Sequence, residues 1–378
     1  MTVDGRVQIG LVGLGYWGPN LARNIAGCPR AQLAWACDLR PDLLAATEDR
    51  YPGIRTTTQF DQMLADPDLD AVVVATTVST HYDLGAAALD AGKHVYVEKP
   101  MASSSTQAID LIARATRSEL VLLPGHTFLY SPPVLKIKEL IDAGDVGEVY
   151  FISMSRVNLG LHQPDVSVVW DLAPHDFSIL RFWLGTGPTE VAAMARACVV
   201  PHTPDVSFIN VRFESGTIAL LELAWLAPSK LRRTAIVGSE RMIVYDDTTS
   251  SEPVRIFDAG AMPPDPSSFG EYQLTYRTGD ILSPKIEPSE PLSLAIADFC
   301  EAILEGSTPR STPETGLDVV LTLEAVERSL EAGGAPTRCF SSGSGGLLTP
   351  EVLGQAPAAT ASSGNGAAVR SSLSDRRS

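Results

Sequence analysis

The stretch VQIGLVGLGYWG, residues 7–18, decides the first half of the fold. It opens with the continuous apolar run Val7–Val12, as expected for a strand that is covered on both faces of a parallel sheet. Gly13, Gly15 and Gly18 follow in the spacing G-x-G-x-x-G, and a helix-like segment begins directly behind them. Strand, glycine-rich turn and helix in this order are typical of a dinucleotide-binding Rossmann unit. The sequence therefore predicts an N-terminal α/β domain with a doubly wound parallel sheet.

An acidic residue stands at the end of the next strand-like segment, Ala31–Cys37, where this motif needs one. A carboxylate at Asp38 accepts hydrogen bonds from the adenosine ribose hydroxyls and repels a 2′-phosphate, which favours NAD over NADP. Arg40 lies close by and offers a partner to a 2′-phosphate, so NADP stays open as the second possibility. Tyr16 and Trp17, inside the glycine-rich turn, are further expected cofactor contacts.

The first 125 residues or so alternate strand-like and helix-like segments, which predicts a parallel sheet. The expected helices are Pro19–Ala26, Pro41–Tyr51, Tyr82–Ala91 and about Thr106–Ser118. The further expected strands are Ala71–Ala75, His94–Val97 and Val121–Leu123.

After a helix expected from Pro132 to about Ala143, the pattern changes to strands with few helices between them. The expected strands are Val149–Val157, Glu190–Val199, Ser207–Phe213, Thr217–Ala224 and Arg233–Val237. Glu214-Ser215-Gly216 is a hairpin signal, so we expect a C-terminal α+β domain with an open, mainly antiparallel sheet. Two expected helices, Leu294–Leu304 and Leu317–Glu331, can pack on either domain. The predicted organisation is a Rossmann domain over 1–125, a substrate-binding and oligomerisation domain over 126–340, and a disordered tail over 341–378 that is rich in Ser, Gly, Ala and Thr.

Composition excludes several classes of function. The 378 residues carry a net charge of −16, with a pI of about 4.8, which argues against nucleic acids and anionic membranes as partners. The five cysteines are scattered and form no C-x-x-C pair, so we expect neither a disulfide framework nor a metal site. With no signal peptide or membrane-spanning run in the sequence, the expected location is the cytoplasm.

The first chemical signal is Glu98-Lys99-Pro100, which closes the apolar run His94–Val97. A lysine at the end of a buried strand must pair its ammonium group or shift its pKa, because desolvating an unpaired charge is costly. Pro100 biases Lys99 toward an extended backbone, which aims the side chain. Ligands of open α/β sheets bind at the carboxyl ends of the strands, so the sequence predicts chemistry at Lys99.

The second chemical signal is WDLAPHD, residues 170–176. If Asp171 is a helix N-cap, Pro174 lies in the first turn, where its missing N–H costs nothing. Asp171 and His175 then share one helix face, and a histidine beside a carboxylate is a tunable general acid/base. Removing hydride from a carbinol needs a base and a cation or donor for the oxygen, which His175 and Lys99 supply. The alternative is that Asp171 only caps the helix and His175 packs beside the tryptophan.

Other polar residues are weaker candidates. Thr76 and Thr77, at the end of the third expected strand, can line the cofactor groove. His81 follows shortly after, with helix capping as the alternative to a ligand contact. His126 and Tyr130 are possible pocket residues whose alternative role is to satisfy a buried hydrogen bond.

Together these motifs resemble the glucose–fructose oxidoreductase/inositol dehydrogenase/MocA (Gfo/Idh/MocA) family, over about residues 5–335. The resemblance rests on the glycine-rich start, Ala75-Thr76-Thr77 with His81, Val97-Glu98-Lys99-Pro100 and the Asp171…His175 pair. It implies a tightly bound nicotinamide cofactor, a substrate between the domains, and Lys99, Asp171 and His175 as catalytic residues. One departure is Thr77, because many members have proline there.

The same resemblance implies cofactor contacts from Glu98, Lys99, His126 and Trp170, and substrate contacts from Lys99, Tyr130, Asp171 and His175. In relatives the peptide corresponding to Lys99–Pro100 is often cis, and the open sheet commonly pairs subunits into dimers or tetramers. A homodimer or homotetramer is therefore the expected partner arrangement.

Arg156 and Asn158, together with WDLAPHD, resemble sugar-nucleotide 3-dehydrogenases and ketoreductases, so the implied substrate is C3 of a nucleotide-activated hexose. Arg156 can bind a carboxylate or phosphate bidentately. Lys230, Arg232 and Arg233 form a basic cluster that is either near a diphosphate or an ordinary solvated strand end. A dehydrogenase of a free sugar or inositol, and a non-catalytic NAD-sensing regulator on the same fold, stay open as alternatives.

Overall fold

The first part of the chain forms a six-stranded parallel sheet. The computed structural model describes residues 5–160, 166–249, 251–262 and 275–342. In spatial order the strands are β3 (Arg55–Thr57), β2 (Ala31–Cys37), β1 (Val7–Val12), β4 (Ala71–Val74), β5 (His94–Glu98) and β6 (Leu122–Gly125). All five pairs are parallel, which confirms the predicted sheet. The strand order reverses between β1 and β4, and such a switch point is where open α/β sheets bind ligands.

The helices of this half follow the predicted alternation. They are α1 (Gly18–Gly27), α2 (Pro41–Arg50), α3 (Phe60–Leu64), α4 (Val78–Asp90) and α5 (Ser105–Arg117). Two elements, β3 and α3, were not predicted. They are only three and five residues long, too short for a hydrophobic period to become visible.

The second part is built on a nine-stranded sheet. Its order is β14 (Thr275–Leu282), β13 (Val254–Met262), β12 (Met242–Asp246), β11 (Leu231–Gly238), β7 (Val149–Val157), β10 (Ile218–Ala224), β9 (Val206–Arg212), β8 (Glu190–Arg196) and β15 (Thr337–Arg338). All pairs are antiparallel except β7 with β10, so the prediction of a mainly antiparallel sheet is confirmed. The predicted hairpin joins β9 and β10, with Gly216 at a φ of +90°.

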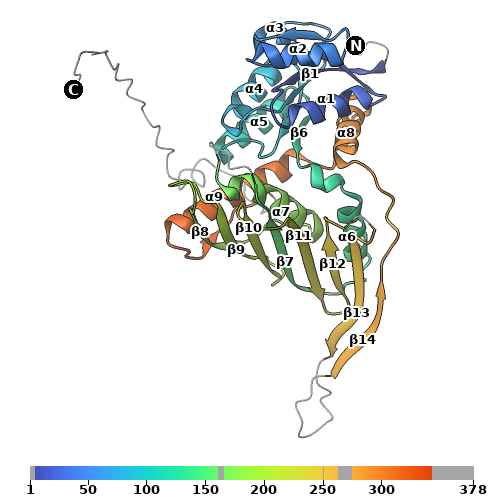
Figure 1. Ribbon diagram of the computed structural model, residues 1–378, viewed down its shortest axis with the longest axis vertical. Helices are drawn as coiled ribbons and strands as arrows, with labels where there is room; N and C mark the ends of the chain where they lie inside the picture. The colour runs from blue at the N-terminus through green and yellow to red at the C-terminus, as the bar shows by residue number, and fades with distance from the viewer. Residues whose placement is uncertain (1–4, 161–165, 250, 263–274, 343–378) are drawn as a thin grey trace, which may run out of the picture. The chain divides into compact units, whose positions relative to one another are not determined.

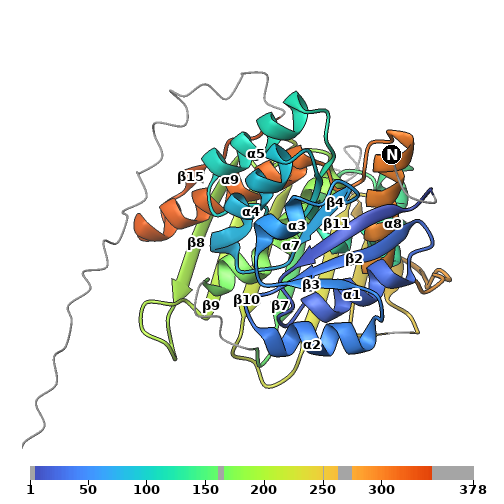
Figure 2. The same ribbon diagram turned by 90° about the horizontal axis from the view of Figure 1, so that it is seen from above.

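Helices cover one face of this sheet (Figures 1 and 2). The chain passes through η2 (Thr127–Tyr130) and α6 (Pro132–Asp142) into β7, and α7 (Val168–Leu184) and α9 (Pro313–Glu331) then pack on the sheet. Their buried side chains form one apolar core with Ile152, Met154, Leu221 and Ile236 from the strands. Because α7 is anchored on the sheet by these side chains, the positions of its polar residues relative to the sheet are fixed.

One late helix returns to the first sheet. Helix α8 (Pro291–Glu305) packs against α1 and β1, beside which it stands in Figure 1. Its buried residues Ile296 and Phe299 join the same core as Ile9 and Leu11 of β1. Helix α8 belongs to the second predicted domain, beyond the predicted boundary between residues 125 and 126, but it shares a core with the first. That boundary stays a prediction, and residues 343–378 of the predicted tail lie outside the described residues.

The opposite face of the second sheet is partly apolar and open. Phe151, Phe208, Ile218 and Leu220 are between 41% and 53% exposed there. Strands β12, β13 and β14 extend this sheet and were missed by sequence reasoning, because their patterns are short or mixed. Among the described residues, no helix combines the length and apolar character that crossing a membrane requires.

Candidate active site

The glycine-rich turn has the shape that a dinucleotide requires. Gly13 has a φ of +95°, and a Cβ there would lie 2.5 Å from the Ala75 carbonyl oxygen. A Cβ at Gly18 would lie 2.4 Å from the Gly13 oxygen, so this glycine allows close packing inside the turn. A Cβ at Gly15 would meet only the Arg40 guanidinium, at 3.6 Å, which leaves open space beside the backbone. The turn therefore fits a pyrophosphate held by backbone N–H groups at the start of α1.

Asp38 is fixed at the end of β2 by the turn itself. Its Oδ2 accepts from the Leu14 N–H at 2.7 Å, and its carboxylate accepts from the Nε and Nη2 of Arg40 at 3.0 and 3.1 Å. Burial opposes ionisation, but the hydrogen bonds from Arg40 and Leu14 outweigh it and lower the pKa of Asp38. A fixed carboxylate thus stands at the end of β2 beside the glycine-rich turn, in which Tyr16 is 84% and Trp17 39% exposed.

His81 ties two loops of the groove together. Its Nδ1 lies 2.9 Å from the Pro100 carbonyl oxygen and its Nε2 lies 3.1 Å from the Thr76 carbonyl oxygen. The helix N-cap is Thr77, so His81 has no capping role. With both nitrogens facing backbone oxygens and the residue 1% exposed, His81 holds the ends of β4 and β5 in place. The Lys99–Pro100 peptide, directly after β5, is cis.

Glu98 links the glycine-rich turn to the end of β5. Its Oε1 accepts from the Trp17 indole N–H at 3.0 Å, and its Oε2 accepts from the Lys99 backbone N–H at 3.3 Å. Burial raises the pKa of this carboxyl group to about 7, although the Lys99 charge opposes the shift. The sequence did not indicate this link, because the two residues lie in separate motifs.

Lys99 and Asp171 meet across the two sheets. The Lys99 Nζ donates to the Asp171 Oδ1 at 3.0 Å and to its backbone oxygen at 2.7 Å. The other carboxylate oxygen accepts from the Trp225 indole at 3.1 Å. The ammonium predicted to need a partner has one, and Asp171 is fixed from both sides. Trp225 was missed, because nothing in its local sequence distinguishes it from a core residue.

The structure corrects the expected start of α7. Its N-cap is Ser167, whose hydroxyl accepts from the Trp170 N–H, and not Asp171. Pro174 therefore lies inside the helix, where it removes the hydrogen bond to the Trp170 carbonyl. The interpretation of Asp171 as only a cap is thus wrong. Ser167 was not recognised because the apolar residues after it were not assigned to a helix.

His175 lies one turn after Asp171 and is neutral. Its ring packs edge to face on Phe128, with centroids 4.9 Å apart, and its Nδ1 is buried without a protein partner among the described residues. Burial and the nearby charges of Lys99 and Arg156 hold the pKa of His175 well below its usual range. At neutral pH the imidazole is therefore uncharged and can accept a proton, and its lowered pKa makes it a weaker base than a free histidine.

His126 is a second buried imidazole at the start of η2. It is fully buried, and neither ring nitrogen has a partner within the described ranges. Burial, with the charges of Lys99 and Arg181, lowers its pKa to about 3. Buried polar atoms normally find partners, so His126 and His175 mark a place where a polar group of a ligand or a water molecule belongs.

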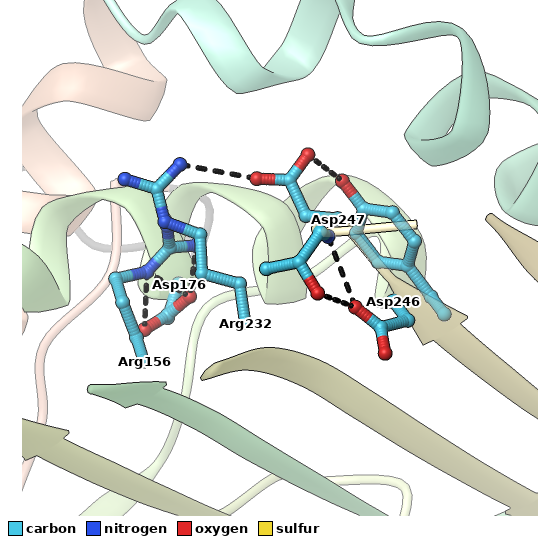
Figure 3. A network of polar contacts seen from close by, with 7 residues as sticks. Arg156, Asp176, Arg232, Asp246 and Asp247 are labelled. Carbon is cyan, nitrogen blue, oxygen red and sulfur yellow. Dashed lines mark hydrogen bonds and ion pairs between the residues drawn. The ribbon is translucent and has the colours of Figure 1, made fainter. Parts of the chain in front are cut away.

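A polar network borders this pair on the inner face of the second sheet (Figure 3). Arg156 shows the expected bidentate geometry, but its partner is Asp176 of the same chain, at 2.6 to 3.1 Å. Arg232 donates to Asp247 at 3.1 Å. Arg232 belongs to the basic cluster of the sequence, whereas Asp176 and Asp247 were not predicted as site residues.

Some predicted residues are engaged elsewhere. The Tyr130 hydroxyl donates to Asp298 of α8 at 2.7 Å, and the Trp170 indole donates to Glu327 of α9 at 2.6 Å. Both side chains are buried at these contacts. Thr76 accepts a hydrogen bond from Thr80, and the side chain of Asn158 lies beside Gly160 after β7. The structure brings Lys99, Asp171 and His175 together, but not the polar groups of Tyr130 and Trp170.

Comparison with known proteins identifies the family. Residues 7–126 match the GFO_IDH_MocA family, described as an oxidoreductase family with an NAD-binding Rossmann fold, and residues 134–244 match the GFO/IDH/MocA C-terminal domain. The chain belongs to the Gfo/Idh/MocA oxidoreductase family. The glycine-rich turn and Asp38 fit the dinucleotide that this family binds.

Several Gfo/Idh/MocA relatives act on sugars or inositols. The chain is 26% identical to a UDP-N-acetylglucosamine 3-dehydrogenase of Acidithiobacillus ferrooxidans, covering 84% of this chain and 98% of the relative. It is 23% identical to a myo-inositol 2-dehydrogenase of Thermotoga maritima, covering 86% and 96%. Among solved structures, a protein from gentamicin A biosynthesis in complex with NAD has a TM-score of 0.75 at 25% identity, covering 90% of this chain and 99% of that one.

Proposed function

We propose that this chain transfers hydride between NAD(H) and a secondary alcohol or ketone of a sugar, a CH–OH oxidoreduction of the EC 1.1.1 type. The observation that carries the proposal is the Lys99 ammonium, held by Asp171 at the carboxyl end of β5 beside a neutral imidazole. A fixed cation and a proton acceptor are the two groups that oxidising a carbinol needs.

Each residue then has one task. His175 accepts the hydroxyl proton of the alcohol, and Lys99 donates a hydrogen bond to the same oxygen as negative charge develops on it. Asp171 and Trp225 keep the lysine in place, so little reorganisation is needed during the reaction. The nicotinamide, when bound, supplies the hydride acceptor. Ketone reduction uses the same groups in reverse, with His175 returning the proton.

For the cofactor we propose NAD in preference to NADP. The Asp38 carboxylate is ionised and fixed where the adenosine ribose belongs, and a 2′-phosphate there meets like charge. Arg40 is paired with that carboxylate by two hydrogen bonds, which makes it less available to a phosphate. Glycines 13, 15 and 18 and the N-terminus of α1 hold the pyrophosphate in this proposal.

The first candidate substrate is the C3 hydroxyl of a nucleotide-activated hexose. It is supported by the UDP-N-acetylglucosamine 3-dehydrogenase relative, which this chain matches over nearly its full length. A free sugar or inositol is the second candidate, supported by the inositol dehydrogenase relatives. The ion pairs Arg156–Asp176 and Arg232–Asp247 also favour it, because both guanidinium groups are already matched by a carboxylate.

We infer that the open face of the second sheet joins two or more copies of the chain. A groove of about 330 Å³ crosses this face and is lined in part by Phe151, Ile218 and Leu220. Water-exposed apolar area of this kind marks interaction surfaces. Replacing Ile218 with Asp should convert the assembly to monomers in light-scattering measurements, whereas Val199→Asp, in an exposed turn, should leave its mass unchanged. A wild-type monomer would contradict the inference.

The test of the proposed function is NADH formation over a panel of alcohols. Purified chain and NAD are mixed with UDP-N-acetylglucosamine, D-glucose and myo-inositol, and NADH absorbance is followed. At least one compound should react, and His175→Asn should lower its rate by roughly 10² to 10⁴-fold. His202→Asn, at an exposed position, is the matched control. NAD binding without any turnover would contradict the proposal and favour an NAD-sensing regulator.

A further inference from the structure

Arg232 lies one aromatic ring away from the imidazole proposed to act on the substrate. The register of β7 and β11 sets Arg232 directly opposite Arg156. Both guanidinium groups lie over Phe128, at 4.7 Å from its ring centroid for Arg156 and 5.8 Å for Arg232. His175 packs on the same ring, with the two ring centroids 4.9 Å apart. Arg232 is therefore close enough to His175 for its charge to act on that imidazole.

The two arginines are held in different ways (Figure 3). Arg156 makes three hydrogen bonds to Asp176, and the two side chains are only 10% and 1% exposed. Arg232 makes one hydrogen bond to Asp247, and these side chains are 31% and 26% exposed. Ion pairs that solvent reaches contribute little to stability, so the partly exposed Arg232–Asp247 pair can exchange partners more readily than the buried pair.

Each of the three cations whose charges act on His175 is paired with an aspartate. Among the described residues, Lys99 pairs with Asp171, and each arginine pairs with its own aspartate. An additional carboxylate or phosphate would have to displace one of these anions and would face the others. A hydroxyl group donates and accepts, so it can join the Arg232–Asp247 pair without adding a charge.

A small cavity lies beside this pair. It has a volume of about 10 Å³, and its lining includes Phe128, Arg232, Tyr245 and Asp247. That is about the room needed for one water-sized group, which a hydroxyl oxygen matches and a carboxylate or phosphate exceeds. The Tyr245 hydroxyl donates to Asp247 Oδ1 at 3.1 Å and so fixes the carboxylate.

We propose that this cavity binds one uncharged hydroxyl group of the sugar, at a position remote from the carbon that is oxidised. The hydroxyl donates to Asp247 and accepts from Arg232, while Tyr245 orients the carboxylate. This inference rests on the proposed function and deepens it. The substrates are sugars or polyols with a neutral hydroxyl at that end, and sugar acids with a carboxylate there are poor substrates.

The experiment compares matched substrates on the NAD-loaded enzyme. The probes are UDP-N-acetylglucosamine, D-glucose and myo-inositol, each with its single-deoxy analogues and, for the two hexoses, the 6-carboxylate. For one hydroxyl position we expect the wild type to prefer the parent substrate by roughly 10²-fold in kcat/KM. This is less than for a fully buried site, because solvent partly reaches the Arg232–Asp247 pair. Asp247→Asn should lower this preference at least ~10-fold and raise the relative rate of the carboxylate.

Controls separate the possible failures. Tyr245→Phe should lower the preference for the parent substrate, as Asp247→Asn does. Asp246→Asn should leave the preference unchanged, because the Asp246 carboxylate accepts from Thr248 instead. Equal losses for parent and deoxy substrates in Asp247→Asn, or a wild type that prefers the carboxylate, would overturn the inference while sugar oxidation stands. If no probe reacts with the wild type, the proposed function fails and this inference fails with it.

Discussion

The proposed nucleotide end of the site is shaped by backbone, and the proposed sugar end is formed by side chains. At the nucleotide end, Gly13, Gly15, Gly18 and Asp38 lie in one βαβ unit, and backbone conformation shapes the groove. At the proposed sugar end, side chains from α7 and from the segments after β5 and β10 meet only because two sheets pack together. The geometry of the first end is determined by residues close together in the sequence, whereas the geometry of the second depends on tertiary contacts. Changes at the two ends should therefore separate cofactor binding from turnover.

Lys99→Ala should give the largest effect, because it removes the donor to the reacting oxygen and leaves the glycine-rich turn untouched. We expect turnover to fall by roughly 10³-fold, since one well-placed donor of this kind contributes about 10²–10³-fold and Asp171 also loses its cation. NAD affinity, measured by calorimetric titration, should change little. Lys136→Ala, at a more exposed position of α6, is the control. Weak NAD binding with normal turnover at saturating cofactor would contradict the assignment.

Gly15→Ala and Gly18→Ala test the nucleotide end without touching the sugar end. At Gly15 the new methyl group meets only the Arg40 side chain, so the fold tolerates it but a pyrophosphate cannot approach as closely. We expect NAD to bind roughly 10²-fold more weakly, at an unchanged melting temperature.

At Gly18 the methyl group meets the Gly13 oxygen at 2.4 Å, so the melting temperature of the free protein should fall as well. Equal melting temperatures for the two variants would contradict this reading of the turn.

Asp38→Ala sharpens the comparison within the nucleotide end. The change removes the carboxylate that repels a 2′-phosphate and frees Arg40 to bind one. We expect the preference for NAD over NADP to fall by roughly 10-fold or more, measured as the ratio of kcat/KM values with one sugar. Asp42→Ala, nearby on α2, should not alter the ratio. An unchanged ratio in Asp38→Ala would show that another group selects the cofactor.

The contrast between the two ends also explains what sequence reasoning achieved. The glycine turn, Asp38 and the parallel strands could be predicted because each needs only local spacing and hydrophobic period. Lys99 and His175 could be predicted as chemical groups, but Trp225 and the Arg232–Asp247 pair depend on contacts between distant segments. The predicted contacts of Trp170 with the cofactor and of Tyr130 with the substrate stay predictions, but the direction of their polar groups could not be foreseen. Their polar groups face α9 and α8, and no local pattern shows which way a buried aromatic residue points.

Glu98→Gln tests the point where the two ends meet, because Glu98 contacts both Trp17 and Lys99. The folded pKa is raised to about 7, from an ordinary value of 4.5. Between these values the folded state binds one more proton than the unfolded state. The wild-type free energy of unfolding therefore loses about 1.4 kcal/mol per pH unit from this group as pH rises, and no more above pH 7.

Glutamine has no such titration, so Glu98→Gln should gain stability relative to wild type between pH 5 and 7 and then hold a constant difference up to pH 8. His126, with its pKa lowered to about 3, contributes a slope of opposite sign below pH 6.5. His126 is present in both the wild type and Glu98→Gln, so its contribution cancels when their free energies of unfolding are subtracted. Urea unfolding at each pH measures the difference, with Glu214→Gln in the exposed hairpin as the control. A difference independent of pH would mean that Glu98 stays ionised in the folded protein, joined to Trp17 and Lys99 as a permanent charge.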